Sequence, residues 1–244
     1  MSLNKAVILA GGNATRLKPI SLYSNKHLLP IYNKPMIYYS ISFLIDLKIK
    51  NILIICNKTD LLLFKQLEKE FLKINFTFKI QTKPKGIADG LRICKKFVNN
   101  ERFIFLLGDN LLHFNKKNIG NFIKIIRDTS FNSVLFTSKV KKPNQFGIIS
   151  KIKNKYLIIE KPKRPQNNRA VIGLYIYDKN CFNYLKRIKE SNRGELEITD
   201  INNLYILNNK VNIINLNKLM VRWFDIGSFD SLFKASVFMK NKSV

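Results

Sequence analysis

The first half of the chain alternates between short apolar runs and amphipathic segments of helical period, which limits its fold more than any other feature. We predict strands at Ala6–Ala10, Asn51–Cys56, Phe76–Ile80, Phe103–Leu107 and Ser133–Val140. We predict helices at Met36–Leu47, Leu61–Leu72, Ile87–Val98 and Ile119–Ile126. Such alternation favours a mostly parallel sheet with helices on both faces, and the continuous apolar runs agree with strands that are buried on both faces.

The second half of the chain has a different pattern. Strands are predicted in succession at Gly147–Ile152, Tyr156–Ile159 and Ala170–Tyr177, and helices at Glu197–Leu207 and Ser228–Met239. We therefore expect one α/β domain over residues 1–244, with a nucleotide-sized half to about residue 140 and an appended half (141–244) that closes over it. Ligands of such sheets bind beyond the carboxyl ends of the strands, which points to the loops after Ala10, Ile80 and Leu107.

The composition predicts a folded chain without a membrane span. Hydrophobic residues make up 46% of the sequence, which is ample for a packed core. The longest apolar runs have five residues, whereas a bilayer-spanning helix needs about 20. No secretory signal is recognised, and Cys56, Cys94 and Cys181 lie far apart without a CxxC pair. We therefore expect a protein of the reducing cytoplasm.

The formal net charge of +27 permits binding to nucleic acid. The positive residues are scattered, however, and stretches such as Lys151–Lys155 fit the bias of an A- and T-rich coding sequence. An anionic small-molecule substrate needs only a few of these charges. The scatter of the positive residues therefore argues against nucleic acid as the main partner, whereas the net charge alone leaves it open.

The loop after the first predicted strand carries groups suited to phosphate. Gly11 and Gly12 allow backbone N–H groups to approach a ligand, and Arg16 adds a planar, permanently charged guanidinium. This loop matches neither the P-loop nor the dinucleotide fingerprint, so on its own it also fits an ordinary turn. Ten residues after Arg16, Lys26 is either a further cation of the site or a solvated surface residue.

Two aspartates lie where a parallel sheet would place a ligand. Asp109 comes just past the strand Phe103–Leu107, and Asp225 lies between a predicted strand and a helix start. Mg²⁺ prefers such sites, because it binds one or two carboxylates together with phosphates and keeps most of its waters. An aspartate before a helix is also a common N-cap, so each residue alone leaves both interpretations open.

Several motifs follow one another in order along the chain. They are Gly11-Gly12-x-x-Thr15-Arg16-Leu17, Lys26-x-Leu28-Leu29-Pro30, Lys34-Pro35-Met36-Ile37, Leu107-Gly108-Asp109-Asn110, Glu160-Lys161-Pro162, Gly173-Leu174-Tyr175, Arg193–Asp200 and Trp223-x-Asp225-x-Gly227. This ordered set resembles the sugar-1-phosphate nucleotidyltransferases, and most of all the glucose-1-phosphate thymidylyltransferases. The resemblance extends from about Lys5 to Met239, nearly the whole chain.

The resemblance implies a Rossmann-like sheet, a sugar-binding second half and a Mg²⁺-dependent condensation of dTTP with α-D-glucose 1-phosphate to dTDP-glucose and pyrophosphate. The catalytic residues that it implies are Arg16, Lys26, Asp109 and Asp225, and the two aspartates would bind Mg²⁺. The implied nucleotide-binding residues are Gly11, Gly12, Thr15, Arg16, Gln81 and Gly86, of which the last two would read the thymine edge. The implied sugar-phosphate-binding residues are Gly147, Glu160, Lys161, Tyr175 and Arg193.

Four positions depart from the family pattern. Ala14 and Asp89 replace a common glycine and glutamine, and Ile172 and Ile226 replace threonines. A positive φ at Ala14 would cost roughly 1 kcal/mol, and the acidic group of Asp89 alters the expected base contacts. Longer family members continue well past the position of Met239, so we do not expect regulation by the end product of the pathway.

Alternatives remain open at this stage. UTP, CTP or another sugar 1-phosphate would fit the same chemistry, since thymine and uracil present the same hydrogen-bonding edge. A non-catalytic sugar-nucleotide sensor would not need the metal pair. We interpret His27 and His113 as structural, Cys56 as a small buried hydrophobe, and Trp223 as packing or as support for the metal site. A homo-oligomer is compatible with the sequence, which does not determine the oligomeric state.

Overall fold

The structure, a computed structural model, describes residues 3–12, 14–83, 85–114, 116–153 and 155–242. The strands are β1 (Lys5–Leu9), β2 (Pro30–Ile31), β3 (Lys34–Pro35), β4 (Asn51–Cys56), β5 (Asn75–Ile80), β6 (Phe103–Leu107), β7 (Asn110–His113), β8 (Ser133–Lys139), β9 (Gly147–Ile152), β10 (Lys155–Glu160), β11 (Arg169–Tyr177), β12 (Val211–Asn215) and β13 (Arg222–Asp225). The α-helices are α1 (Met36–Asp46), α2 (Leu61–Lys65), α3 (Leu67–Glu70), α4 (Asp89–Val98), α5 (Ile119–Arg127), α6 (Asn180–Leu185), α7 (Ile198–Leu207) and α8 (Phe229–Lys240).

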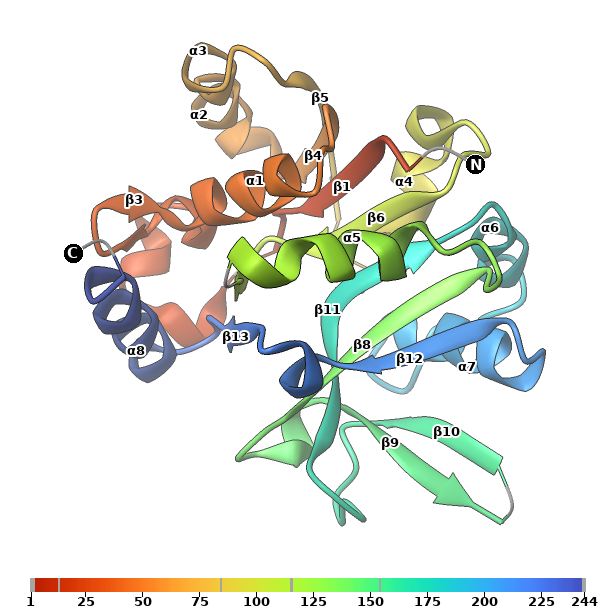
Figure 1. Ribbon diagram of the computed structural model, residues 1–244. Helices are drawn as coiled ribbons and strands as arrows, with labels where there is room; N and C mark the ends of the chain where they lie inside the picture. The colour runs from red at the N-terminus through yellow and green to blue at the C-terminus, as the bar shows by residue number, and fades with distance from the viewer. Residues whose placement is uncertain (1–2, 13, 84, 115, 154, 243–244) are drawn as a thin grey trace.

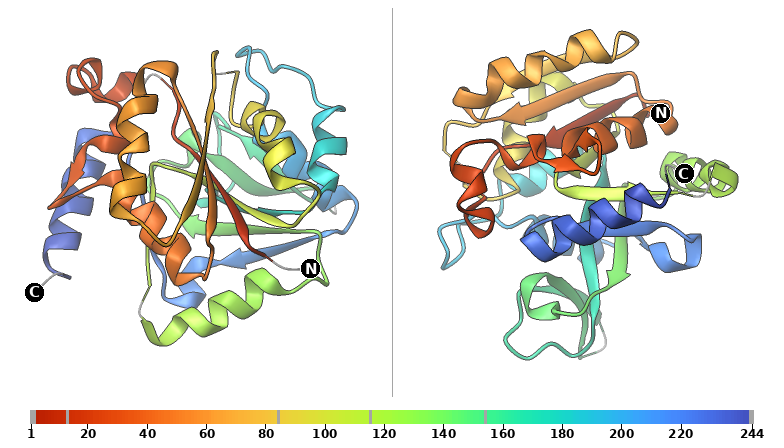
Figure 2. Two further views of the ribbon diagram at one scale, coloured as in Figure 1. Left: turned by 90° about the horizontal axis from the view of Figure 1, so that it is seen from above. Right: turned by 90° about the vertical axis from the view of Figure 1, so that its left-hand side faces the viewer.

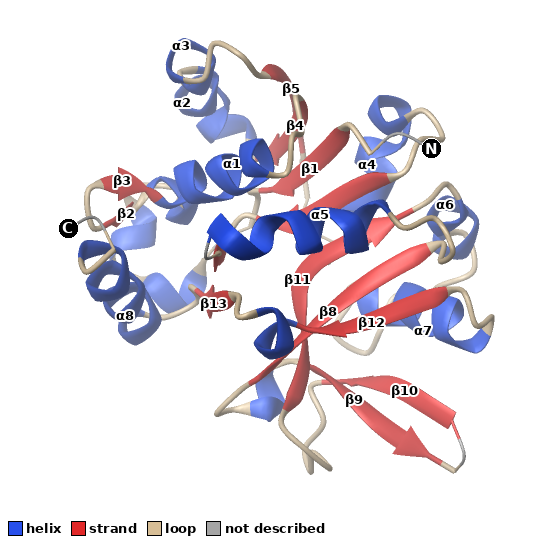
Figure 3. Cartoon of the chain, viewed as in Figure 1, coloured by secondary structure: helices blue, strands red, loops and turns tan. Residues whose placement is uncertain are grey.

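A mixed sheet of nine strands runs through the described part of the molecule, and helices cover both of its faces (Figures 1 and 3). Its order is β10-β9-β11-β6-β1-β4-β5, with β8 paired to β11 and β12 paired to β8. Two small sheets, β2 with β3 and β7 with β13, lie outside it. This architecture confirms the predicted α/β fold.

The first half of the chain builds four parallel strands, β1, β4, β5 and β6. In the centre, Val7 of β1 lies between Leu53 of β4 and Phe105 of β6. Successive side chains of a strand point to opposite faces, and accordingly Val7 and Ile8 belong to different hydrophobic clusters. Both residues are fully buried, which confirms that these strands are covered on both sides.

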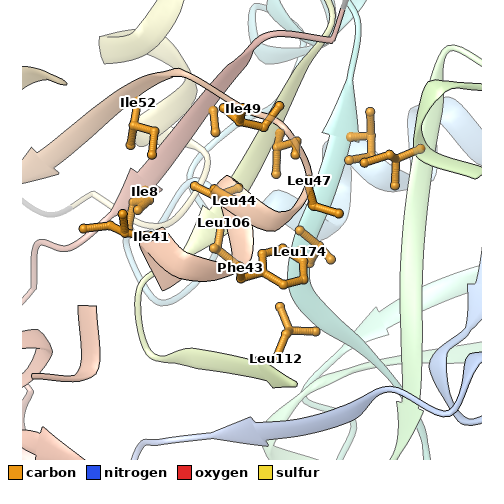
Figure 4. Packing of buried hydrophobic residues seen from close by; sticks show 14 of the residues in the cluster. Ile8, Ile41, Phe43, Leu44, Leu47, Ile49, Ile52, Leu106, Leu112 and Leu174 are labelled. Carbon is orange, nitrogen blue, oxygen red and sulfur yellow. The ribbon is translucent and has the colours of Figure 1, made fainter. Parts of the chain in front are cut away.

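Helices from different parts of the chain supply the two layers. Helices α1 and α5 pack on the face that includes Ile8, and Figure 4 shows Ile41 and Leu44 of α1 near Ile8 and Leu106. Helices α4, α6 and α7 pack on the other face. Pro35 is the last residue of β3 and directly precedes α1.

The second half of the chain joins the sheet through β11. This strand pairs antiparallel with β6, β8 and β9, and its pairing with β8 shifts register between Val171 and Tyr175. Beyond the shift, β9 and β10 form an antiparallel pair that extends away from the parallel strands (Figures 1 and 2). The chain then returns through α6, α7 and β12 to β13 and α8.

Local patterns missed or misjudged some of these elements. The predicted single helix Leu61–Leu72 is divided into α2 and α3, because Gln66 donates its N–H to Leu63 in a 3₁₀-type bond. Helix α6 and strand β12 were not expected, since both are short and neither has a clear period. None of the described helices is long and apolar enough to cross a membrane.

Candidate active site

A cavity of about 650 Å³ opens at the carboxyl ends of β1 and β6, where sheets of this kind bind ligands. Both halves of the chain line it. The predicted site residues in its lining are Thr15, Arg16, Asp109, Gly147, Glu160, Lys161, Tyr175 and Asp225. The other predicted residues, which do not line it, are Gly11, Gly12, Lys26, Gln81, Gly86 and Arg193.

A smaller cavity of about 200 Å³ adjoins the first through shared residues. Thr15 and Arg16 line both cavities, and Lys26 lines the smaller one. A Cβ added at Gly227 would lie 2.7 Å from Nη2 of Arg16, so a glycine is needed there for the guanidinium to lie against the backbone. The two predicted cations therefore lie close to the loop that carries Asp225.

Lys26 forms an ion pair with Asp109. The two side chains are 16% and 15% exposed, so the pair is largely shielded from water. Burial by itself would raise the pKa of Asp109, but the adjacent ammonium group of Lys26 holds it below its usual value. Asp109 is thus kept ionised in a site that would otherwise favour its protonated form.

Asn110 fixes the second oxygen of Asp109. Its amide group donates to Asp109 Oδ1 at 2.9 Å. Its own Oδ1 accepts from Trp223 Nε1 at 2.7 Å and from the backbone N–H of Gly173 at 3.0 Å. Trp223 is therefore linked through Asn110 to Asp109, one of the two predicted metal ligands. The sequence analysis did not single out Asn110, although it directly follows Asp109.

Asp225 is brought beside Asp109 by the pairing of β13 with β7. Asp225 lies opposite Asn110 in this pairing, and the backbone N–H of Ile226 donates to the carbonyl of Asp109 at 2.9 Å. The Asp225 carboxylate has neither a hydrogen bond nor an ion pair with any residue that the structure describes. Burial raises its pKa, and the charge of Asp109 raises it further.

Two neighbouring carboxylates, one of them without a partner in the described part of the chain, fit Mg²⁺, which takes few protein ligands and completes its shell with water and phosphate. No group of three or more His, Cys, Asp or Glu side chains that could hold a metal occurs among the described residues. The donor set therefore suits an ion that is shared with a phosphate substrate rather than a metal enclosed by protein.

The lining of the cavity also includes polar and charged groups from β10 and α7. Thr199 donates a hydrogen bond to Glu160 Oε2. A Cβ at Gly147 would lie 2.9 Å from the Ile158 side chain and 3.3 Å from Glu160 Oε2, which explains the glycine there. Tyr175 is 4% exposed and also lines the cavity.

Arg193 is held by carboxylates, one of them that of Glu160 in the cavity lining. Its Nη2 lies 2.7 Å from Glu197, 3.5 Å from Glu160 and 3.5 Å from Glu195. Lys161 Nζ lies 3.9 Å from Glu160. The two cations predicted to bind the sugar phosphate are therefore neighbours of Glu160.

The loop after β1 that carries Gly11 and Gly12, called the glycine loop below, is held by a network of side-chain amides centred on Asp60. Asp60 accepts from Asn25 at 2.7 Å and from Asn57 at 3.1 Å. Asn25 in turn donates to the carbonyl of Ala10, and Asn57 accepts from the N–H of Gly12. The sequence analysis missed this network, whose signal was that Asn57 directly follows a predicted strand.

The structure shows the backbone conformation or the burial of three of the residues that depart from the family pattern. Ala14 has a φ of +44°, so the expected cost of roughly 1 kcal/mol applies. Asn13, in the same loop, lies outside the described residues. Ile172 and Ile226 are fully buried in hydrophobic clusters, where an apolar side chain is well accommodated.

Gln81 and Gly86 lie near the glycine loop and α4 rather than in the main cavity. Gln81 is 5% exposed and donates to Asp89 at 3.0 Å. Gly86 has a φ of +94°, and a Cβ there would lie 2.5 Å from the carbonyl oxygen of Leu196. The close neighbour that requires glycine at position 86 is therefore the backbone of Leu196.

The residues interpreted as structural behave accordingly. His27 is buried and bonds to Asn25, and burial lowers its pKa to about 3. His113 packs against the Phe238 ring. Cys56 is buried, and burial raises its pKa to about 11, which makes it an unreactive thiol.

Comparison with known proteins identifies the family of the chain. A family model described as Nucleotidyl transferase matches residues 5–242. The chain belongs to this family. It is 36% identical over 240 residues to the glucose-1-phosphate thymidylyltransferase of Neisseria meningitidis, which covers 97% of this chain and 82% of the relative. It is 33% identical over 240 residues to the protein of that name in Mycobacterium tuberculosis, with the same coverage.

Solved structures show the same fold for this nucleotidyltransferase family member. A Bacillus anthracis protein assigned as a glucose-1-phosphate thymidylyltransferase, in complex with a sucrose, superposes with a TM-score of 0.85 and 36% identity, covering 97% of this chain and 95% of the other. A UDP-glucose pyrophosphorylase complexed with UDP-glucose has a TM-score of 0.84 at 21% identity, covering 99% and 100%, and shares the fold. The predicted sugar-1-phosphate nucleotidyltransferase membership is confirmed.

Proposed function

We propose that this chain condenses dTTP with α-D-glucose 1-phosphate to give dTDP-glucose and pyrophosphate. The observation that carries the proposal is that Arg16, Asp109, Asp225 and Glu160 line one cavity. Lys26 lines the adjoining smaller cavity and is paired with Asp109. The names of relatives that are 33–36% identical over most of the chain support the same substrates.

The reaction needs charge neutralisation more than a base. A phosphate oxygen of the sugar 1-phosphate attacks the α-phosphorus of dTTP, and the bond between that phosphorus and the oxygen bridging to the β-phosphate breaks. The electron pair of this bond leaves on pyrophosphate. Arg16 holds the triphosphate, and Lys26 neutralises charge that develops at the α-phosphate.

Asp109 and Asp225 would hold Mg²⁺. When bound, the ion supplies positive charge to the phosphates of the nucleotide. Asn110 keeps Asp109 in one orientation, so its carboxylate is directed toward the cavity before substrate arrives. Asp225, which has no partner among the described residues, is the second anionic ligand.

The sugar phosphate binds in the same cavity, beside Glu160. Glu160 accepts hydrogen bonds from sugar hydroxyls, while Lys161 and Arg193 bind the phosphate. Arg193 exchanges part of its contact with Glu197 for the phosphate oxygens. Gly147 and Tyr175 shape the pocket, and Gln81 reads the base with the backbone near Gly86.

The proposal is tested by measuring pyrophosphate release with five nucleoside triphosphates against a panel of sugar 1-phosphates, with and without Mg²⁺. We expect the highest kcat/KM for dTTP with glucose 1-phosphate and no turnover in excess EDTA. A preference for UTP or CTP, or for another sugar, would keep the chemistry but change the substrate. Absence of turnover with every pair would support a non-catalytic sensor instead.

A further inference from the structure

We propose that Asp89 fixes the orientation of the Gln81 amide, and thereby selects a nucleobase that carries a hydrogen-bond donor at N3. The inference rests on the proposed role of Gln81 in reading the base. It assigns a specificity-determining role to a residue that does not itself contact the substrate, at a position where this chain departs from the family pattern.

Asp89 accepts hydrogen bonds from two donor side chains, those of Gln81 and Arg92. It is 1% exposed, at the start of α4. Its Oδ1 accepts from Arg92 Nε at 2.9 Å and from Arg92 Nη2 at 2.7 Å, and its Oδ2 accepts from Gln81 Nε2 at 3.0 Å. Each oxygen therefore has its own donor, and the pair with Arg92 matches an ionised carboxylate.

An ionised carboxylate can only accept hydrogen bonds. If the Gln81 amide were turned over, its Oε1 would face Asp89 Oδ2, and two acceptors would meet without a proton in a buried place. Such an unsatisfied buried contact is strongly unfavourable. Asp89 therefore holds Nε2 of Gln81 and leaves its Oε1 as the group that is presented elsewhere.

The presented oxygen lies at the glycine loop. A Cβ added at Gly11 would be 2.9 Å from Gln81 Oε1, so this oxygen lies directly against the loop after β1. Among the residues that the structure describes, none donates a hydrogen bond to Oε1. Gln81 thus offers a fixed acceptor beside the loop that is proposed to hold the nucleotide.

This acceptor distinguishes two kinds of pyrimidine. Thymine and uracil carry N3–H, a donor that matches Oε1. Cytosine has an unprotonated N3, which is itself an acceptor and would be repelled. The arrangement therefore favours a base with two ring carbonyls and an N–H between them.

The same contacts predict what a single substitution does. In Asp89→Asn, the new side-chain oxygen stays with Arg92, which offers only donors, and the new amide nitrogen then faces Gln81. Gln81 must turn its Oε1 toward that nitrogen and present Nε2 to the base. The presented group changes from an acceptor to a donor, which suits cytosine.

The test is to measure kcat/KM for dTTP, UTP and CTP, with glucose 1-phosphate, in the full chain and its variants. We expect the ratio of dTTP to CTP to fall by about tenfold or more in Asp89→Asn. Arg92→Ala should keep the ratio of kcat/KM for dTTP to that for CTP found in the unsubstituted chain, because the Asp89 carboxylate can still only accept hydrogen bonds. The double variant Asp89→Asn/Arg92→Ala should lie between the two, because its amide is free to adopt either orientation.

Two further measurements separate the possible failures. A Gln81→Ala variant that keeps the full dTTP preference would show that Gln81 does not read the base, and the proposed base-reading role fails. If Gln81→Ala loses the preference while Asp89→Asn keeps it, only the role of Asp89 is overturned. If Asp89→Asn does not fold, kcat/KM for dTTP and for its N3-methyl analogue is measured in the unsubstituted chain and in the exposed-site variant Arg92→Ala. Both proteins should use the analogue about tenfold or more less efficiently. Equal use of dTTP and the analogue by either protein overturns the inference.

Discussion

The ammonium group of Lys26 is paired with the carboxylate of Asp109, although 83 positions separate the two residues in the sequence. The pair places a cation that is proposed to act on the substrate in contact with a ligand that is proposed to hold the metal. Substrate phosphates must therefore compete with Asp109 for Lys26, and Lys26 lowers the pKa of Asp109.

Replacing Lys26 by methionine removes the charge but keeps the length of the side chain. We expect kcat to fall by roughly 10²–10³-fold, since one charge-assisted contact to the transition state is lost. The Kd for glucose 1-phosphate, measured by calorimetry, should change little. Lys5→Met is the matched control, because Lys5 also forms an ion pair, with Glu101, at the opposite end of β1. A tenfold or smaller loss in kcat would argue that Lys26 only stabilises Asp109.

Asp225→Asn should change stability and activity in opposite directions. The carboxylate has no partner among the described residues, and burial and Asp109 disfavour its charge, so a neutral amide should raise Tm in metal-free buffer. Turnover with Mg²⁺ should fall by about 10³-fold or more, because a charged ligand is lost. Asp109→Asn should also abolish turnover but lower Tm, since it leaves Lys26 unpaired. A Tm that falls in Asp225→Asn would contradict this account of the site.

Asp60→Ala should make the glycine loop more mobile, although Asp60 is not among the residues proposed to contact the substrate. Asn25 and Asn57 would each lose a hydrogen bond to Asp60. We expect KM for dTTP to rise by about tenfold while KM for glucose 1-phosphate stays within about twofold, because only the nucleotide end is affected. Glu68→Ala, an exposed change on neighbouring α3, is the control. Equal increases in both KM values would indicate a general loss of structure.

His27 should make the protein less stable as the pH falls below neutrality. Burial lowers its pKa in the folded state to about 3, below the ordinary value of 6.5, so the unfolded chain binds a proton that the folded chain excludes between these values. Stability from this group is fully present above about pH 6.5 and declines below it. From pH 7.0 to 5.5 the loss should be about 1 kcal/mol in urea unfolding. His27→Gln should remove about that much of the pH dependence, and an unchanged slope would refute the assignment.

Gly86→Ala and Gly120→Ala form a matched pair of substitutions. At Gly86 the backbone has positive φ and a Cβ would overlap the Leu196 carbonyl, so we expect a loss of about 2 kcal/mol or more in unfolding free energy. At Gly120, within α5, nothing lies within 4 Å of a Cβ, so alanine should stabilise by about 0.5–1 kcal/mol. Denaturant unfolding of both variants measures the difference directly. A Gly86→Ala variant as stable as the unsubstituted chain would mean that Leu196 moves freely.

Much of the site was predictable because its residues follow strands. Asp109 comes after β6 and Arg16 after β1, and parallel strands bring their carboxyl ends to one edge. Asp225 could be predicted from its motif but not from its surroundings. The absence of a partner for its carboxylate among the described residues depends on where β13 pairs with β7, which a local pattern does not reveal.

The sequence by itself determined the class of fold, most of the longer helices and strands, and the residue types that are proposed to bind phosphate and metal. These follow from local periods of two and 3.6 residues and from the chemistry of single side chains. Only the tertiary structure decided that Lys26 pairs with Asp109, that Arg193 lies among three carboxylates, and that Asp89 holds Gln81. Such pairs join residues from separate elements, so they depend on how the packed layers place side chains in space, which no local period encodes.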